Sequence, residues 1–360
     1  MENQASVEQR LDLITKGLIE VHGGDSIRQI LEEGRNPKGF WATAPTGKPH
    51  LAYFVPLLKL ADFVKAGADV TVLFCDLYAF LVNYKHSWET VGHRTAYYKH
   101  IVRAVLQTLG VPENTVHFVE GSSYELTKAF SLDNYKLSVL ADVDEVKGTG
   151  DEYRNPGKLS VLFCPGLPAL AEEYLDSDFQ FGGEDQRGLF AFNERFLPQL
   201  GYRKRAHLMN TMVPGLQGIK MSSSVPDSKI EFLEDPESVR RKIFNASCED
   251  GKAAENGLLS LLKLVVIPFN RNRLENEGAT DRDKGVFQVK RGNGEVESYA
   301  SYEDLETAFS TGKISSGDLK EATVQAVNAM LDPLRKQYEA NKEWQAVDKL
   351  AYPEDQNIAL

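Results

Sequence analysis

The stretch that decides the fold lies near the N-terminus and reads Phe40-Trp41-Ala42-Thr43-Ala44-Pro45-Thr46-Gly47-Lys48-Pro49-His50-Leu51-Ala52-Tyr53. It opens apolar and β-prone, breaks into a turn rich in Pro and Gly, and resumes an apolar helical period at Leu51. This pattern predicts a strand, a tight turn and a helix. Such a turn offers backbone N–H groups and a helix N-terminus to an anion, and His50 can reach a phosphate from it. On its own, the turn is more typical of a simple capped helix start.

A second motif lies far downstream and reads Lys220-Met221-Ser222-Ser223-Ser224. A mobile loop with one cation and three hydroxyls can close over a pyrophosphate leaving group and neutralise the charge that grows in the transition state. A Ser-rich loop alone is usually a solvated turn. The two motifs together, in this order, indicate chemistry on ATP.

Further blocks carry a resemblance that covers almost the whole chain. They are Tyr53-Phe54-Val55-Pro56, Ala61-Asp62-Phe63, Phe181-Gly182-Gly183, Asp185-Gln186-Arg187, His207-Leu208-Met209-Asn210, residues 212–215, Gly317-Asp318-Leu319-Lys320 and Leu331-Asp332-Pro333. With the two motifs, these blocks resemble eukaryotic cytosolic tyrosyl-tRNA synthetase, a class I aminoacyl-tRNA synthetase. We expect a divergent paralogue of that family with an altered amino-acid pocket.

The expected fold class is α/β. Strands are predicted at 40–43, 70–74 and 116–119 and helices at 50–66 and 87–109, and this alternation favours a parallel Rossmann-like sheet with helices on both faces. Residues 7–33 also carry a helical period. The resemblance divides the chain into a catalytic domain, 1–235, and a mainly helical domain, 236–360, similar to the family's anticodon-binding domain. The catalytic domain would contain a connective insertion at about 122–177, where the family builds its dimer interface, so a homodimer is expected.

The resemblance implies an ATP site made of three groups of residues. The triphosphate would be lined by Thr43, Thr46, Gly47 and His50. Adenine and ribose would be held by Gly182, Gly183 and Asp185. Charge in the transition state would be stabilised by Lys220, Ser222, Ser223 and Ser224, with His50 and Thr46 also catalytic. A carboxylate would attack the α-phosphate to give an acyl-adenylate, with Mg²⁺ arriving on ATP and no metal held by the protein.

The amino-acid pocket departs from the family pattern. In tyrosyl-tRNA synthetases, a Tyr before the Trp of the first strand and an Asp after a Tyr-Pro-Gly-Leu-Gln turn grip the phenol hydroxyl of the substrate. Here these positions are Phe40 and Ala171. The Tyr and Gln of that turn bind the α-ammonium group in the family, whereas this chain has Cys164 and Pro168. Four polar contacts are therefore expected to be missing.

Other predicted pocket positions are mixed. They are the unchanged Gln186, Tyr78 in place of the usual His, Glu125 in place of the usual Gln, and the aromatic residues Phe74 and Tyr124. A tyrosyl site that makes no contact with the phenol hydroxyl of its substrate cannot discriminate tyrosine from phenylalanine by that hydroxyl. We therefore expect an adenylate-forming ligase for a carboxylate other than tyrosine, passing the acyl group to a small amine, alcohol or thiol. There are two alternatives. One is a tyrosine-tRNA ligase in which the family's pocket positions correspond to other residues than those matched above. The other is a non-catalytic regulatory paralogue.

Charge bears on tRNA as a partner. The chain carries a formal charge of −11, and residues 236–360 hold 17 Lys+Arg against 21 Asp+Glu, a net of −4. The family's Lys-rich insertion segment is replaced by the acidic run at 142–151, although Asp318 matches an anticodon-reading Asp. Because proteins that grip a phosphate backbone usually show a basic face, tRNA binding is expected to be weakened.

Composition indicates a cytoplasmic enzyme. No run approaches the roughly 18 apolar residues of a membrane span, and the N-terminus lacks a secretory signal. Cys75, Cys164 and Cys248 show no pairing or metal spacing. The histidines at 86, 93 and 100 repeat every seven residues, which on a helix puts neighbours about 10 Å apart, too far to share one metal ion.

Overall fold

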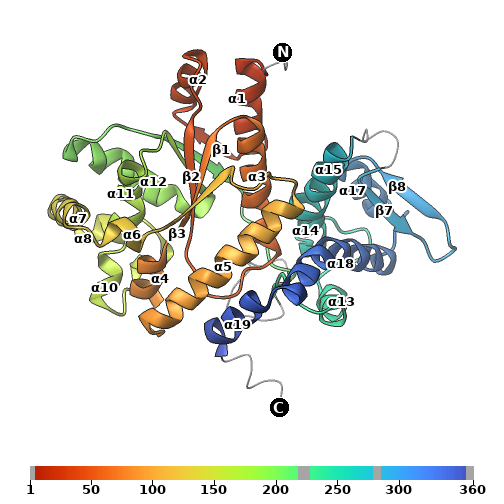
Figure 1. The fold of residues 1–360 in the computed structure, drawn as a ribbon. Coiled ribbons are helices and arrows are strands. Elements are labelled where there is room, and N and C mark those ends of the chain that lie inside the picture. Colours follow the sequence, from red (N-terminus) through yellow and green to blue (C-terminus); the bar gives the residue numbers. More distant parts are fainter. Residues whose placement is uncertain (1–4, 84, 218–227, 279–284, 354–360) are drawn as a thin grey trace.

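A six-stranded sheet forms the centre of the computed structural model, which describes residues 5–83, 85–217, 228–278 and 285–353 (Figure 1). The strand order is β1-β6-β5-β2-β3-β4. The strands are β1 (Glu20–His22), β2 (Lys38–Thr43), β3 (Asp69–Phe74), β4 (Val116–Glu120), β5 (Phe179–Gly183) and β6 (Ala206–Asn210). All neighbours pair in parallel except β1, which is antiparallel to β6. The sheet is therefore mixed and not purely parallel as predicted. Its antiparallel edge strand, β1, lies within residues 7–33, for which only a helical period was predicted.

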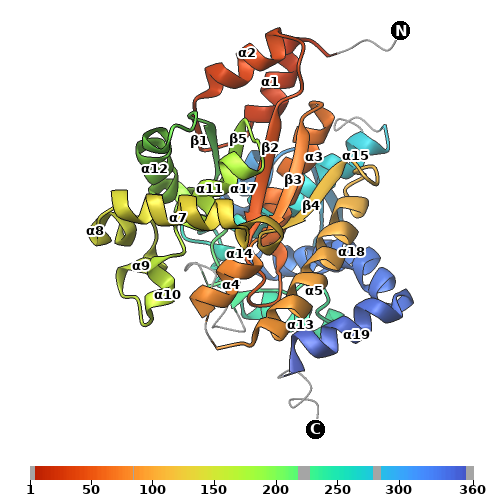
Figure 2. The same ribbon diagram turned by 60° about the vertical axis from the view of Figure 1, so that its left-hand side comes forward.

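Alternation along β2 places helices on both faces of the sheet (Figure 2). Trp41 belongs to the large core built with helices α3 (Phe54–Lys65) and α5 (Trp88–Thr108). Its neighbour Phe40 points the other way and packs with Ala171 of helix α11 (Gly166–Tyr174). Gly39 has to be small, because a Cβ there would lie 2.0 Å from the ring of Phe179 on β5.

The first half of the chain contains further helices and 3₁₀ turns. They are α1 (Val7–Thr15), α2 (Gly24–Glu32), the 3₁₀ turn η1 (Leu51–Tyr53), α4 (Asp76–Asn83), η2 (Glu184–Gln186), α12 (Arg187–Phe196) and η3 (Leu197–Leu200). The helices predicted at 50–66 and 87–109 are confirmed as η1 with α3 and as α5. Ser87 starts α5 by accepting a hydrogen bond from the Thr90 N–H at 3.2 Å.

The connective insertion is a set of short helices on the opposite side of the sheet from the C-terminal elements (Figures 1 and 2). Besides α11, it contains α6 (Ser122–Glu125), α7 (Lys128–Leu140), α8 (Val143–Lys147), α9 (Asp151–Arg154) and α10 (Leu159–Leu162). Several large apolar side chains are exposed here: Leu126, Leu132, Tyr135, Val139, Leu140, Val143, Leu159 and Phe163. Val139 is 85% exposed, and exposed apolar side chains that form one patch mark interaction surfaces.

Residues beyond 235 are mainly helical, as predicted, with one exception. The elements are α13 (Pro236–Asn245), α14 (Gly257–Leu261), the π-helical η5 (Leu262–Val266), α15 (Ile267–Asn276), β7 (Phe287–Lys290), β8 (Val296–Tyr299), α17 (Tyr302–Ser310), α18 (Ser316–Ala340) and α19 (Lys342–Ala351). The polar stretch 277–298 contains the two-stranded hairpin β7–β8, in which alternation buries Phe287 and Val289. One apolar core runs from Ile14 to Tyr352, so both halves share it, and the division at 235 stays a prediction.

No helix within the described ranges is long and apolar enough to cross a membrane.

Candidate active site

A cavity of about 410 Å³ lies where β2, β5 and β6 end. In a parallel sheet this edge is where ligands bind, because the loops that leave the strands diverge there. Nine residues predicted from sequence line it: Thr43, Thr46, His50, Tyr78, Pro168, Gly182, Gly183, Asp185 and Gln186. The structure thus brings the turn after β2 and the glycines of β5 to one site.

The turn at residues 46–48 is held from behind by α5 and α19. The Arg94 guanidinium donates to the carbonyl of Thr46 at 2.6 Å and to that of Ala351 at 2.9 Å, and this side chain is buried. The Tyr98 hydroxyl donates to the Gly47 carbonyl at 2.6 Å. Gly47 therefore does not line the cavity itself but belongs to the anchored part of the turn.

Lys48 does not line the cavity either. Its ammonium lies 3.2 Å from the carboxylate of Asp348 and 5.1 Å from the ring centroid of Tyr352. The charge of Lys48 is thus engaged with the last helix of the chain.

His50 presents a neutral imidazole to the cavity. Burial, followed by the nearby charge of Lys229, lowers its pKa to about 4, so the ring is uncharged at neutral pH. Its Nδ1 is buried and has no hydrogen-bond partner among the described residues. A neutral imidazole has one N–H donor. His50 can therefore donate one hydrogen bond to a phosphate oxygen without bringing a positive charge.

The end of β5 is open because two glycines occupy it. A Cβ at Gly182 would lie 3.2 Å from the Phe190 ring, and one at Gly183 would lie 2.5 Å from the Asp185 carboxylate. A larger residue at either position would collide with these neighbours and fill part of the cavity. The glycines leave the backbone accessible next to Asp185, which suits the close approach of a nucleoside.

Four of the predicted pocket residues lie in the surrounding core and not on the cavity surface. Phe40 and Ala171 are buried together, Phe74 belongs to the main core, and Cys164 packs with Tyr153. None of these four side chains carries a hydroxyl, carboxylate or amide group. Pro168 is buried too but lines the cavity, and the predicted loss of polar contacts to a substrate at Phe40, Ala171, Cys164 and Pro168 stays a prediction.

Tyr124 and Glu125 lie close to this region on α6. Tyr124 packs against the cluster of Phe40, Ala171 and Cys75, and its hydroxyl has no hydrogen-bond partner among the described residues. Glu125 is 3% exposed, and within the described ranges its Oε2 also has no hydrogen-bond partner. Burial, followed by the charge of Asp76, raises its pKa to about 8. The Glu125 carboxyl is therefore mostly protonated at neutral pH.

Sequence reasoning missed a hydrogen-bonded group that meets the cavity through Tyr78 and Tyr153. The Tyr153 hydroxyl donates to the Tyr78 hydroxyl at 2.9 Å, and Tyr78 donates to Glu152 Oε1 at 2.7 Å. No sequence signal marked Tyr153 and Glu152, because they lie in the insertion, where the chain departs from the family pattern. Gln180 was missed as well, although it lies one residue before the Phe-Gly-Gly block and lines the cavity.

Lys220, Ser222, Ser223 and Ser224 lie outside the described residues, so their predicted roles remain predictions. The described residues contain no group of three or more His, Cys, Asp or Glu side chains placed to hold a metal ion.

Comparison with known proteins identifies the class of protein that this fold and cavity define. Residues 32–332 match the family described as tRNA synthetases class I (W and Y). The chain superimposes on the Archaeoglobus fulgidus tyrosyl-tRNA synthetase complexed with L-tyrosine with a TM-score of 0.80 and 30% identity, covering 92% of this chain and 99% of that one. The chain belongs to this class I synthetase family.

Two curated relatives narrow the comparison. The chain is 45% identical over 358 residues to the cytoplasmic tyrosine–tRNA ligase of Gallus gallus, covering 98% of this chain and 65% of that protein. It is 43% identical over 361 residues to the cytoplasmic tyrosine–tRNA ligase of Saccharomyces cerevisiae, covering 98% of this chain and 90% of that protein. The chain thus spans less than two thirds of the length of the chicken relative.

These comparisons confirm the family resemblance and the α/β class I fold. They do not support our main expectation of a non-tyrosine acid passed to a small acceptor, and they favour the alternative of a tyrosine-tRNA ligase. Neither a divergent paralogue nor weakened tRNA binding is shown by them.

Proposed function

We propose that this chain is an aminoacyl-tRNA synthetase that activates an amino acid with ATP and transfers it to tRNA, with tyrosine as the first substrate to test. The observation that carries the proposal is the convergence of nine predicted ATP and substrate residues on one cavity. A chain that matches proteins named tyrosine–tRNA ligase over 98% of its length supports tyrosine and tRNA as the partners. Those relatives are also named cytoplasmic, which supports the same location here.

In the proposed reaction, a carboxylate oxygen of the amino acid attacks the α-phosphorus of ATP. A bond forms between that oxygen and phosphorus, the bond to the β-phosphate oxygen breaks, and pyrophosphate leaves with the electron pair. Neutral His50 donates a hydrogen bond to the phosphates, Thr43 and Thr46 add hydroxyls, and the Gly182–Gly183 wall receives the nucleoside. Mg²⁺ would enter bound to the ATP phosphates.

The test is ATP–pyrophosphate exchange with each of the standard amino acids and a set of simple carboxylic acids, followed by charging of total tRNA. We expect exchange with at least one amino acid and acylation of tRNA by it. Absence of exchange with every acid would contradict the proposal and favour the non-catalytic alternative.

A second candidate function is activation of an acid other than tyrosine, and the apolar pair Phe40 and Ala171, which packs directly behind Cys75 of the cavity lining, favours it. Neither side chain offers a partner to a phenol hydroxyl. The double variant Phe40→Tyr with Ala171→Asp should then improve tyrosine binding, but only in part, since Cys164 and Pro168 remain. Efficient tyrosine-dependent exchange by the unmodified chain would exclude this second candidate.

A homodimer through the insertion completes the proposal. Exposed Val139, Val143 and Leu159 lie on α7, α8 and the start of α10, and a partner copy would cover them. We expect a dimer by light scattering and its dissociation by Val139→Glu. An unmodified chain that is monomeric at micromolar concentration would contradict this part. Residues 1–235 and 236–360 remain the proposed catalytic and tRNA-binding units.

A further inference from the structure

Two helices of the C-terminal half hold a short segment of the chain, residues 229–234. The Lys242 ammonium on α13 donates to the carbonyl of Lys229 at 2.9 Å and lies 2.7 Å from the carboxylate of Glu234. Arg335 on α18 donates to the backbone carbonyl of Glu234 at 2.8 Å. The two ends of the segment are thus bound to helices that lie after it in the sequence.

The same segment pairs with the turn that carries His50. The Leu51 N–H donates to the Ile230 carbonyl at 2.9 Å, and a further N–H of the segment donates to the Pro49 carbonyl at 3.4 Å. Between these two hydrogen bonds, His50 and Glu231 form an isolated antiparallel bridge. The backbone on both sides of His50 is therefore bound to the segment, and its position depends on where the segment lies.

Lys242 and Glu234 form a largely buried ion pair. Their side chains are 8% and 12% exposed, and the Glu234 carboxylate also accepts from the Glu231 N–H at 3.0 Å. Taking two charges out of water costs about as much as their attraction returns, so such a pair adds little net stability. It does fix one geometry, because the donors of an ammonium group must each reach an acceptor. The contacts lead from Lys242 through Glu234 and Glu231 to His50.

We propose that Lys242 is a positioning residue of the active site, which holds the turn carrying His50 in place through residues 229–234. The inference rests on the proposed function, in which His50 donates a hydrogen bond to the phosphates of ATP. It gives a part in catalysis to a helix outside the predicted catalytic domain, 1–235. A misplacement of about 1 Å in a reacting site can cost about 10²-fold in rate.

Amide hydrogen exchange in the free protein tests whether Lys242 holds the turn. In Lys242→Met the Leu51 N–H, which donates to the segment, should exchange at least about tenfold faster, because the local structure opens more often. Arg240→Met is the matched control. Arg240 lies on the same helix and pairs with Glu321 of α18 at 2.8 Å, but its side chain is 43% exposed and lies outside the contacts described above. This control should leave the Leu51 exchange rate unchanged.

Pyrophosphate exchange tests whether the held turn matters for the reaction. Lys242→Met should lower kcat about 10- to 100-fold and leave KM for the amino acid within about twofold. In a His50→Ala background, the same substitution should lower kcat by less than about twofold, because its effect passes through a side chain that is already absent. A general loss of stability would lower kcat equally in both backgrounds.

A second variant keeps the test valid if the first one misfolds. Lys242→Met alone leaves the Glu234 carboxylate buried without its cation, which destabilises a protein, whereas Lys242→Met combined with Glu234→Met removes both charges. The double variant should unfold at a urea concentration near that of the unmodified chain. It should still show the faster Leu51 exchange and the lower kcat.

An unchanged Leu51 exchange rate in the double variant would overturn the inference. So would equal losses of kcat from Lys242→Met with and without the His50 side chain, or equal effects of Lys242→Met and Arg240→Met. If the unmodified chain shows no pyrophosphate exchange while the Leu51 amide responds as expected, the proposed function alone is contradicted.

Discussion

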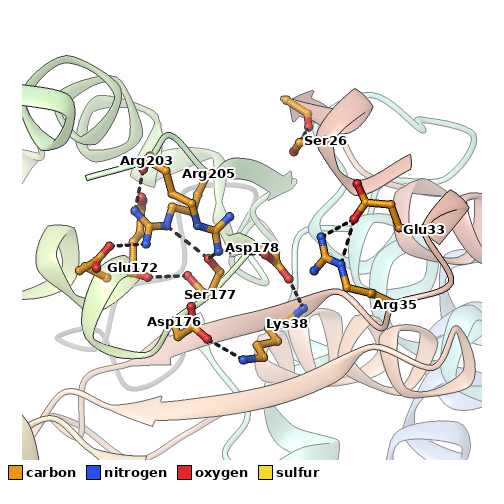
Figure 3. Close-up of polar contacts among 12 residues, drawn as sticks. Ser26, Glu33, Arg35, Lys38, Glu172, Asp176, Ser177, Asp178, Arg203 and Arg205 are labelled. Carbon is orange, nitrogen blue, oxygen red and sulfur yellow. Dashed lines mark hydrogen bonds and ion pairs between the residues drawn. The ribbon is translucent and has the colours of Figure 1, made fainter. Parts of the chain in front are cut away.

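Two hollows of nearly equal size lie at the two ends of strands β2, β5 and β6. They differ in whether their polar side chains have partners within the protein. At the carboxyl ends lies the cavity of about 410 Å³, and at the amino ends a groove of about 400 Å³. Figure 3 shows the polar contacts in and around this groove. In the groove, Lys38 pairs with Asp176 at 2.6 Å and Arg203 with Asp178 at 2.9 Å. Arg35 and Glu33 form a third pair, at 2.8 Å. Every charged side chain that lines the groove thus has a partner within the protein.

The cavity differs because polar atoms at or near it lack partners. Within the described part of the chain, His50 Nδ1 is buried without a hydrogen bond, and so are the Tyr124 hydroxyl and Glu125 Oε2 nearby. Leaving a buried polar group unpaired costs about 1–3 kcal/mol, and such atoms in a folded protein call for an explanation. The ATP of the proposed function would supply a partner for His50, which lines the cavity. The charged side chains of the groove at the amino ends already have partners, so none of them requires a ligand.

The largest effect on the cavity is expected from the removal of the His50 side chain. His50→Ala should lower the rate of pyrophosphate exchange by about 10²- to 10³-fold, the usual effect of deleting one preorganised donor to developing charge. Because the ring is neutral, Lys in its place should not restore activity. Exchange within about twofold of the unmodified chain would show that the unpaired imidazole plays no part in catalysis.

The second prediction concerns how the cavity is supported. Arg94→Ala removes the bonds to the carbonyls of Thr46 and Ala351 and should raise KM for ATP about tenfold or more while changing kcat less. Arg103→Ala on the same helix is the matched control, because that side chain is exposed and lies over the Phe118 ring. Equal effects of the two variants on KM for ATP would contradict a specific role for Arg94.

His50 and Arg94 also show which parts of the site could be predicted from the sequence. The strand, turn and helix around His50 were predictable, because local periodicity and turn chemistry specify them. Arg94 was not, since its partners Thr46 and Ala351 lie 48 and 257 residues away in the chain. Tyr153 could not be placed either, because only folding of the insertion brings its hydroxyl to Tyr78. Contacts between distant segments leave no local pattern.

The third prediction tests Glu125 through pH. Its pKa is raised from 4.5 to about 8, so between these values the unfolded chain has lost a proton that the folded chain keeps. Stability must then fall as pH rises through this window, by on the order of 4 kcal/mol in total. Glu125→Gln should remove that fall, measured as the difference in urea unfolding free energy between about pH 5 and about pH 8. The exposed Glu113→Gln should leave the slope unchanged, and an unaltered slope in Glu125→Gln would refute the assignment.

The smallest effect is expected in the groove. The Lys38 and Asp176 side chains are 49% and 75% exposed, and exposed ion pairs contribute only about 0–1 kcal/mol because water and salt screen them. Lys38→Ala, Asp176→Ala and the double variant should therefore give a coupling energy below about 1 kcal/mol in urea unfolding. The same variants should leave kcat and KM for ATP and amino acid unchanged, since the pair lies at the opposite ends of the strands that form the cavity. A loss of activity in these variants, with stability retained, would mean that the groove takes part in function and that the contrast between the two ends of the sheet is wrong.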